Sequence, residues 1–334
     1  MGKKLLITID TEADNQWDVS RGISTENTLY LPRFQELCER YGFIPTWLTN
    51  WEMCNDERFV QYMKPKNDAG LCEIGMHLHA WNNPPEFPLE TVTDQRAYLI
   101  EYTESQMASK IDALLDALQS SFEAPITSHR SGRWALDDRY IALLAERGFV
   151  VDCSVTPHMS WEGALGQSGM PGSDYSMSDE LPYELRPGLL EVPMTIRRTN
   201  RFALDAVHEP QDVLRQGKRL VMGQWQWLRP SMNPSTSSLT SLLRDVSKKD
   251  DAYAMFMIHS SELMPGGSPN FPNESSIEKL YRVIDRTFAV AAKLGFEGQG
   301  MTEFAKDFFG CRGKKLKASE KAFEREGLQS EKND

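Results

Sequence analysis

The sequence predicts an α/β fold in which about seven parallel strands form a single β/α barrel. Short apolar segments of strand length alternate with longer amphipathic segments along most of the 334 residues. This alternation is typical of parallel sheets whose strands are joined by helical crossovers. About seven such units suit one barrel better than a doubly wound sheet. Several apolar runs also end abruptly in aspartate, histidine or arginine, as strands do when they open onto a site at a barrel mouth.

Seven segments are expected to be strands because they are short, apolar and rich in β-branched or aromatic residues. Their polar residues gather at the ends, so most of each segment is expected to be buried. In chain order these segments are 5–10, 45–49, 73–79, 126–131, 149–155, 191–196 and 252–259.

Longer segments carry apolar residues at helical spacing. In the segment 25–41, Leu31, Phe34 and Leu37 fall on one face, and Gly42 follows as a C-cap. The segment 160–187 is rich in Gly, Ser and Pro and is long for a loop, so we expect a rim or lid there. The remaining expected helices are 93–118, 137–147, 210–227, 235–246 and 275–294.

Composition limits the classes of function. The apolar share of 40% and the charged share of 25% predict a globular domain, expected over 1–311, followed by a charged and flexible tail over 312–334. The net charge of −11 argues against nucleic acid or an anionic membrane as a partner, although local charge in a cleft could still bind a small anion.

Location and redox state follow from two further features. No run approaches 18 apolar residues, and the first apolar run, near the N-terminus, is too short for a signal peptide, so we expect a cytoplasmic protein. The five cysteines are scattered and none has Cys-x-x-Cys spacing, which predicts reduced thiols rather than disulfides or a cysteine zinc site. Oligomeric state cannot be predicted from these features.

The segment 73–81, with the sequence EIGMHLHAW, contains the most specific chemical signal. Side chains alternate along a strand, so His77 and His79 point to the same side and both imidazoles can reach one ion about 2 Å away. The alternative is a pair of histidines on the polar face of an exposed strand. The short apolar run before them and Pro84-Pro85 soon after favour a strand that ends in a site.

Four other strand ends carry complementary groups. Two histidines and a carboxylate leave a coordination position for water on a metal ion, and a second carboxylate can act as a base. A separate histidine can protonate a leaving group, and an arginine can keep the base ionised. The strand ends that provide these groups are Asp10-Thr11-Glu12, His129-Arg130, Asp152 and His259.

Five blocks in this order resemble the polysaccharide deacetylases of carbohydrate esterase family four, the NodB-homology family. The Asp-Thr-Glu start, His-Leu-His-Ala-Trp and Arg-Ser-Gly-Arg-Trp further resemble a divergent subgroup among lipopolysaccharide and capsule biosynthesis proteins. The resemblance implies a distorted, incomplete β/α barrel. The matching blocks are 5–10 (LLITID), 73–77 (EIGMH), 129–133 (HRSGR), 151–155 (VDCSV) and 258–259 (IH).

The resemblance also implies the role of each matched residue. Asp10 would be the general base, Arg130 would pair with it, and His77 would be the first metal histidine. Asp152 would tune His259, which would be the general acid. A backbone N–H near Arg133 would help to stabilise an oxyanion.

The chain departs from the family pattern in two places. The family's second aspartate is replaced by Thr11, so Glu12 becomes the metal candidate and Asp14 the alternative. The second family histidine would fall at Trp81, so His79 must replace it. One divalent ion is expected, with Zn²⁺ preferred and Co²⁺, Ni²⁺ or Fe²⁺ also compatible with these ligands. Trp81, Trp134 and Arg133 are candidate sugar contacts.

The function these features predict is metal-dependent removal of an acetyl group, foremost an N-acetyl group, from a sugar of a cell-surface glycan or its precursor. Two alternatives remain open from the sequence. The same fold could hydrolyse a non-sugar amide or cyclic imide, or an altered metal site could leave a non-catalytic barrel that binds glycan.

Overall fold

A curled, mostly parallel sheet forms the centre of the computed structural model, which describes residues 2–16, 22–199, 223–230, 236–249 and 252–311. In this part of the chain, the seven strands from β10 to β7 in the sheet order run parallel to one another, as predicted, and β6 joins them antiparallel. In sheet order the strands are β10 (Tyr253–His259), β1 (Lys4–Thr11), β2 (Pro45–Thr49), β3 (Glu73–Leu78), β4 (Ser128–Ser131), β5 (Val151–Asp152), β7 (Leu189–Glu191) and β6 (Tyr183–Arg186), with β11 (Glu297–Gly298) alongside β1.

The sheet curls into a barrel that β-pairing does not close. Among the described residues β7 does not pair with β10, and the segment 192–195 lies in the gap between them. Met194 N donates to Val155 O at 2.9 Å, and Met255 N on β10 donates to Thr195 Oγ1 at 2.8 Å. These bonds connect the two edges, and the fold is the predicted incomplete β/α barrel.

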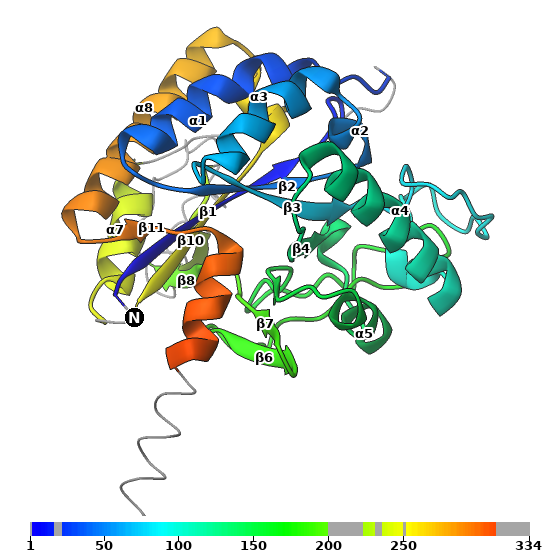
Figure 1. Cartoon of the computed structure of the whole chain (residues 1–334). Helices are drawn as coiled ribbons and strands as arrows, with labels where there is room; N and C mark the ends of the chain where they lie inside the picture. The colour runs from blue at the N-terminus through cyan, green and yellow to red at the C-terminus, as the bar shows by residue number, and fades with distance from the viewer. Residues whose placement is uncertain (1, 17–21, 200–222, 231–235, 250–251, 312–334) are drawn as a thin grey trace, which may run out of the picture.

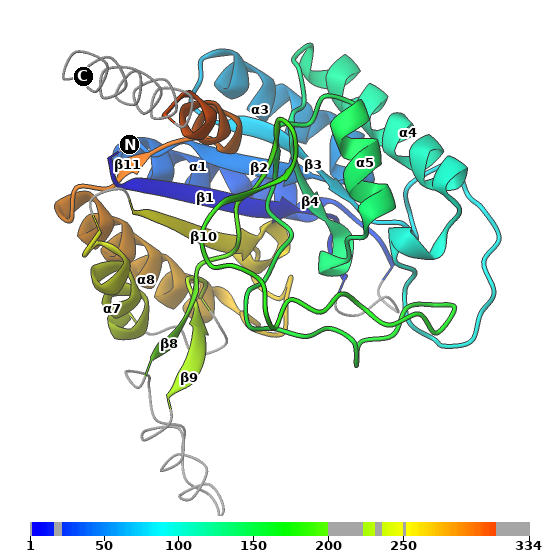
Figure 2. The same ribbon diagram turned by 90° about the horizontal axis from the view of Figure 1, so that it is seen from below.

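One predicted strand is wrong. The segment 191–196 was expected to be continuous, but β7 ends at Glu191 and β8 (Ile196–Thr199) begins only at the far end of the segment. Pro193 lies between the two strands and has no N–H to donate to a ladder. β8 pairs instead with β9 (Gln224–Trp227) in a separate two-stranded sheet, which projects from the body of the molecule in Figure 2.

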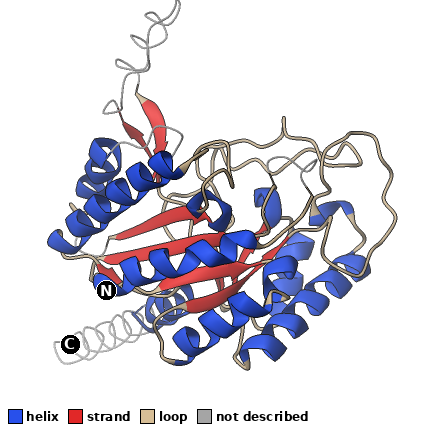
Figure 3. Cartoon of the chain, turned by 90° about the horizontal axis from the view of Figure 1, so that it is seen from above, coloured by secondary structure: helices blue, strands red, loops and turns tan. Residues whose placement is uncertain are grey.

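Helices cover the outer face of the sheet (Figures 1 and 3). The helix expected from residue 93 begins later, because Thr103 and Gln106 form a capping box there. The helix α3 was not predicted. The α-helices are α1 (Leu31–Arg40), α2 (Trp51–Cys54), α3 (Glu57–Asp68), α4 (Glu104–Phe122), α5 (Asp138–Glu146), α7 (Thr236–Val246) and α8 (Glu274–Lys293), and residues 301–311 are also helical.

Four short 3-10 helices join these elements in the described part of the chain: η2 (Glu26–Tyr30), which comes just before α1, η3 (Leu99–Glu101), η4 (Gly132–Trp134) and η5 (Ser260–Leu263). The helix expected over 210–227 is wrong at its end, where residues 224–227 form β9. The rest of that segment up to 222, and the expected tail over 312–334, lie outside the described residues. No helix in the described ranges is long and apolar enough to cross a membrane.

Alternation along each strand divides the core into two parts. On β1, Leu5, Ile7 and Ile9 belong to the large cluster under the helices, whereas Leu6 belongs to a second cluster inside the barrel. Since successive side chains point to opposite faces, Asp10 faces the barrel interior with Leu6. The same alternation decides which polar residues of the other strands can meet Asp10.

The outer core should be sensitive to the loss of Phe34. This buried ring of α1 packs against Trp47, Phe256 and Phe288. We expect Phe34→Ala to lower the free energy of unfolding by about 3–5 kcal/mol, because it leaves a cavity in a packed core. The measurement is urea unfolding followed by circular dichroism. The control is Leu29→Ala, whose side chain is 61% exposed and should change stability by less than about 0.5 kcal/mol. Equal effects of both changes would contradict this packing.

Candidate active site

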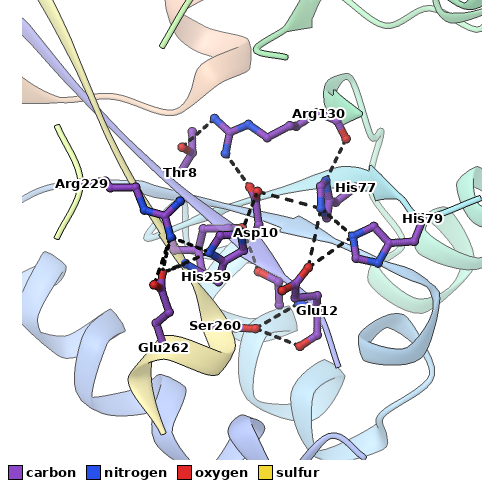
Figure 4. A network of polar contacts seen from close by, with 12 residues as sticks. Thr8, Asp10, Glu12, His77, His79, Arg130, Arg229, His259, Ser260 and Glu262 are labelled. Atoms are coloured by element: carbon purple, nitrogen blue, oxygen red, sulfur yellow. Dashed lines mark hydrogen bonds and ion pairs between the residues drawn. The ribbon is translucent and has the colours of Figure 1, made fainter. Parts of the chain in front are cut away.

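Four strands deliver the predicted site residues to the interior of the barrel mouth. Asp10 of β1 lies opposite His259 of β10, at the last residue pair between these two strands. His77 of β3 lies opposite Arg130 of β4. Figure 4 shows Asp10 between Arg130, His77 and His259. The Asp10 carboxylate oxygen Oδ2 lies 4.0 Å from His77 Nε2 and 3.8 Å from His259 Nε2. Residues far apart in the sequence thus converge around one carboxylate.

Arg130 forms a buried ion pair with Asp10. Its Nη1 donates to Asp10 Oδ1 at 2.5 Å, while Nη2 donates to Thr8 Oγ1 at 2.9 Å and Nε donates to Cys153 O at 3.1 Å. Burial alone would raise the pKa of Asp10, but the charges of Arg130, His77 and His259 outweigh it and lower the pKa to about 2. The structure therefore keeps Asp10 ionised, with one carboxylate oxygen fixed by Arg130 and the other directed at the histidines.

Glu12, His77 and His79 form a buried cluster that could hold a metal ion. His77 Nε2 and His79 Nε2 lie 2.9 Å apart, and Glu12 Oε2 lies 3.3 Å from His79 Nε2 and 4.0 Å from His77 Nε2. Two zinc–nitrogen bonds of about 2.0–2.1 Å at a tetrahedral angle place their nitrogens about 3.3 Å apart. The three side chains are thus close to the spacing that one ion requires.

The protonation state of the two histidines also fits a metal. His77 Nδ1 lies 2.9 Å from Arg130 O, to which it can only donate, so the Nε2 lone pair of a neutral ring points into the cluster. Burial lowers the pKa of His77 to about 4 and that of His79 to about 3, so both are neutral at pH 7. The buried Nδ1 of His79 has no partner among the described residues. Two neutral imidazoles facing each other beside a carboxylate fit a divalent cation.

Glu12, rather than Asp14, is the carboxylate of this cluster. Asp14 accepts hydrogen bonds from Ser24 Oγ, from the backbone N–H groups of Glu26 and Asn27, and from the Asn27 side chain. It therefore anchors the loop before η2. Glu12 is held by its backbone, since its N–H donates to Ser260 Oγ at 3.0 Å and its carbonyl accepts from the same hydroxyl. Its carboxylate is left to face the histidines.

His259 is paired with a carboxylate that the sequence analysis did not assign. Its Nδ1 lies 3.1 Å from Glu262 Oε2, and Arg229 Nη2 donates to both oxygens of Glu262 at 3.0 and 3.1 Å. Burial would lower the pKa of His259, but Glu12 and Glu262 outweigh this effect and raise it. Arg229 and His259 in turn hold the pKa of Glu262 well below its usual range, against its burial. His259 is therefore poised to carry a proton.

Asp152 does not contact His259, and the predicted partnership between them is corrected. On β4 and β5 the register pairs His129 with Asp152, and both face away from the barrel interior that holds Arg130. Asp152 Oδ1 lies 2.5 Å from His129 Nδ1, and Asp152 Oδ2 accepts from Ser154 N at 2.8 Å. His129 Nε2 also lies 2.8 Å from the hydroxyl of Tyr140. This polar network is part of the core on the other side of the sheet.

The cluster opens into a cavity of about 670 Å³ that also contains the three predicted sugar contacts, Trp81, Arg133 and Trp134. Trp81 stacks on His79 with ring centroids 4.2 Å apart. Trp161 and Ala164 line the same cavity, so the start of the segment 160–187, which was expected to be a loop, forms part of its rim. The end of that segment is not a loop, because Tyr183–Arg186 form β6. Aromatic walls around a polar floor suit the faces of a sugar ring.

A close backbone approach brings the turn after β4 to the metal cluster. A Cβ at Gly132 would lie 2.5 Å from Leu78 O and 2.9 Å from His79 Cδ2, so only glycine fits there. The next two residues, Arg133 and Trp134, have positive φ angles of 55° and 64°. Residues other than glycine rarely adopt a positive φ, and those that do are found mainly at functional sites. The turn sets both side chains into the cavity wall.

Sequence reasoning missed three residues near the site: Glu262, Arg229 and Arg96. Glu262 follows His259 by three residues, a spacing that turns its carboxylate back onto the histidine in η5. Arg229 follows β9 and lies between two segments that were expected to be helical, 210–227 and 235–246. Arg96 lies inside the expected helix 93–118, so neither arginine was placed at a strand end.

Comparisons with known proteins agree with this fold. A protein from Mycobacterium smegmatis assigned as a polysaccharide deacetylase superposes with a TM-score of 0.53 over 92% of both chains, at 14% sequence identity. A family 4 carbohydrate esterase from Streptomyces lividans, solved with acetate, is similar at TM-score 0.41, 11% identity and 89% and 91% coverage of this chain and of the esterase. The peptidoglycan deacetylase PdaC from Bacillus subtilis is similar at TM-score 0.43, 9% identity and 95% and 97% coverage.

No protein-family model matches the chain, and no curated protein matches its sequence. At 14% identity the similarity to the Mycobacterium smegmatis protein establishes a shared fold over almost the whole chain. The chemistry must therefore be argued from the residues of the site.

The placement of Asp152 predicts a structural role. We expect Asp152→Ala to lower the free energy of unfolding by about 3 kcal/mol, because it leaves His129 Nδ1 and Ser154 N buried without their partner. Thermal and urea unfolding would measure this loss. Asp245→Ala, which removes an exposed ion pair with Lys248, is the control and should cost less than about 1 kcal/mol. A fully stable Asp152→Ala protein would refute the role.

Proposed function

We propose that the protein is a metal-dependent deacetylase that removes an acetyl group, foremost an N-acetyl group, from a sugar. The observation that carries this proposal is that three sets of functional groups line one cavity. Asp10 provides an ionised carboxylate, Glu12 with His77 and His79 provides a metal cluster, and His259 provides a proton donor. Hydrolysis of an amide requires a base, a polarising charge and an acid in these relative places.

A divalent ion held by Glu12, His77 and His79 would acidify a water molecule and polarise the acetyl carbonyl. Zn²⁺ is the ion we propose, since two imidazoles and one carboxylate are a common set of ligands for a catalytic zinc that keeps a position open. The neutral state of both histidines, caused by their burial, lets them bind a cation without first releasing a proton.

The residues of the chain would move the protons. Asp10 takes a proton from the attacking water as the water oxygen bonds to the acetyl carbon. Arg130 keeps Asp10 ionised and oriented for this step. His259, on the other side of Asp10, gives its proton to the sugar nitrogen as the C–N bond breaks, and acetate and a free amine are released. Glu262 stabilises the protonated ring of His259 through Nδ1 and leaves Nε2 facing the cavity.

The cavity wall would select the substrate. Trp81 and Trp134 offer aromatic faces to a sugar ring beside the cluster. We further propose that the substrate is a cell-surface glycan or one of its precursors, which is supported by the resemblance of the five sequence blocks to enzymes of that chemistry. Acetate release from a panel of N-acetylated sugars and of non-sugar amides would separate this proposal from an amidohydrolase of small amides.

Metal binding is the first test of the proposed cluster. We expect the protein to bind one Zn²⁺ per chain, and His77→Ala to weaken binding by at least about 100-fold, because the ion loses a direct ligand. Calorimetric titration with Zn²⁺ measures the affinity. A chelator should abolish acetate release and added Zn²⁺ should restore it.

The control for this test is His158→Ala, which removes a histidine paired with Glu180 outside the cluster and should leave zinc affinity unchanged. Full activity of the chelated protein or of His77→Ala would refute the proposed mechanism.

The proposed acid predicts a pH dependence. Glu262 raises the pKa of His259, so the Glu262→Gln change should lower that pKa. His259 should then lose its proton at a lower pH. Activity that needs protonated His259 falls as pH rises through this pKa, so the alkaline limb of kcat should move to lower pH. We expect the variant to be more impaired at pH 8 than at pH 6.

The control variant is Glu278→Gln, which alters an exposed carboxylate on α8 paired with Arg33 and should leave the whole pH profile in place. An alkaline limb that Glu262→Gln leaves unmoved would show that His259 is not the group whose titration limits the reaction.

A further inference from the structure

We propose that the substrate carries an oxyanion, a carboxylate or a phosphate, on the acetylated sugar or on the unit next to it, and that Arg96 and Arg133 bind this group. This inference rests on the proposed deacetylase function and specifies its class of substrate. It starts from an unusual feature of the cavity wall, where two half-buried arginines lie close together without a carboxylate partner.

Both arginines line the same cavity as the metal cluster and His259. The guanidinium of Arg96 lies over the ring of Trp81, 5.0 Å from its centroid, and Trp81 in turn stacks on His79. Arg96 and His79, a residue of the metal cluster, therefore both contact Trp81. Arg133 immediately follows Gly132, whose backbone comes so close to His79 that a Cβ there would lie 2.9 Å from His79 Cδ2. A sugar at the cluster would lie within reach of both side chains.

Neither arginine is neutralised. Within the described parts of the chain, no carboxylate oxygen lies within 4.0 Å of a guanidinium nitrogen of Arg96 or Arg133, whereas the other buried or half-buried arginines have such partners. Arg229, in the same cavity, is paired with both oxygens of Glu262. In a chain with a net charge of −11, two cationic groups without an acid are an exception that needs a reason.

Neutral contacts hold both side chains in place. Arg133 Nη1 donates to Arg96 O, its Nη2 donates to Leu165 O at 3.0 Å, and its guanidinium lies 4.1 Å from the ring centroid of Tyr98. Arg96 Nη1 donates to Gln16 Oε1 at 2.8 Å. A guanidinium has five N–H donors, so each retains donors for a ligand. These contacts orient the charges but do not offset them.

The two arginines repel each other, and the acidic groups near them lie beyond ion-pair distance. Burial lowers the pKa of both arginines, and the charge of Arg133 lowers that of Arg96 further, while Glu12 and Glu52 act in the opposite sense on Arg96 and Glu101 on Arg133. Asp94 lines the same cavity but is exposed. An oxyanion between the two guanidiniums would relieve their repulsion, and arginine binds carboxylate and phosphate with paired, charge-assisted hydrogen bonds.

The test measures the activity of the zinc-loaded enzyme on three N-acetylated sugars. They are a neutral N-acetylglucosamine oligomer, N-acetylglucosamine 1-phosphate and an N-acetylated aminouronic acid, and acetate release gives kcat/KM for each. We expect at least one acidic sugar to be preferred over the neutral one, and the acid that is preferred identifies the oxyanion. Higher salt should reduce the preference, because the binding is electrostatic.

Arg96→Gln and Arg133→Gln should each lower the ratio of kcat/KM for the acidic sugar to that for the neutral sugar by about tenfold. The effect should be mainly on KM, and Arg133→Lys should restore part of it. The matched control is Arg33→Gln, since Arg33 also lies over an aromatic ring, that of Tyr281, but on the outer surface at α1. It should leave the ratio unchanged.

A second readout does not depend on activity. Calorimetry of the metal-free protein should detect the acidic sugar and show weaker binding by both glutamine variants. If acetate is released from neutral and acidic sugars alike, or if the variants impair both equally, the oxyanion site is refuted while the deacetylase stands. If no sugar is deacetylated but the acidic sugar binds and needs Arg96 and Arg133, the deacetylase fails and the oxyanion site stands.

Discussion

The buried ion pair of Asp10 and Arg130 is the interaction on which the site depends. The two residues lie on β1 and β4, which are separated in the sheet by β2 and β3, so their side chains can meet at 2.5 Å only across the interior of a curled sheet. Two exposed charges would contribute little at this distance, but two fully buried charges cannot lose either partner without a large cost. The pair therefore ties the curvature of the barrel to the ionised state of its central carboxylate, and His77 and His259 take their places around that carboxylate.

Local partners give neighbouring groups in one cavity different protonation states. His77 and His79 are buried with little compensation and stay neutral, which suits metal ligands. His259 is also buried, but Glu12 and Glu262 favour its charged form, which suits a proton donor. Asp10 stays ionised because of Arg130. The same reasoning makes Arg96 and Arg133 notable, because in the described structure neither has a carboxylate within ion-pair distance. The cavity thus has separate groups of residues for the proposed cation, proton and anion.

Most of the fold and of the site could be predicted from the sequence, because strands are short apolar runs and their side chains alternate. That rule placed His77 and His79 on one side, as the structure has them, and it also accounts for His129 facing away from Arg130. The same rule applied to β5 turns Asp152 away from His259. The role predicted for Asp152 came from the family resemblance instead. Pro193 broke an expected strand, and the pairing of β8 with β9 replaced an expected helix end. Both depend on partners distant in sequence. Arg229 and Arg96 reach the cavity through such tertiary placement and could not be recognised locally.

The proposed chemistry depends on the cluster of Glu12, His77 and His79. Its most direct test is a crystal structure of the protein grown with Zn²⁺, with anomalous diffraction recorded above and below the zinc absorption edge. We predict one strong anomalous peak per chain at about 2.0–2.2 Å from His77 Nε2, His79 Nε2 and a Glu12 carboxylate oxygen, with a further position open to the cavity. A protein saturated with Zn²⁺ that shows no peak there, with these three side chains bonded to one another instead, would contradict the central claim.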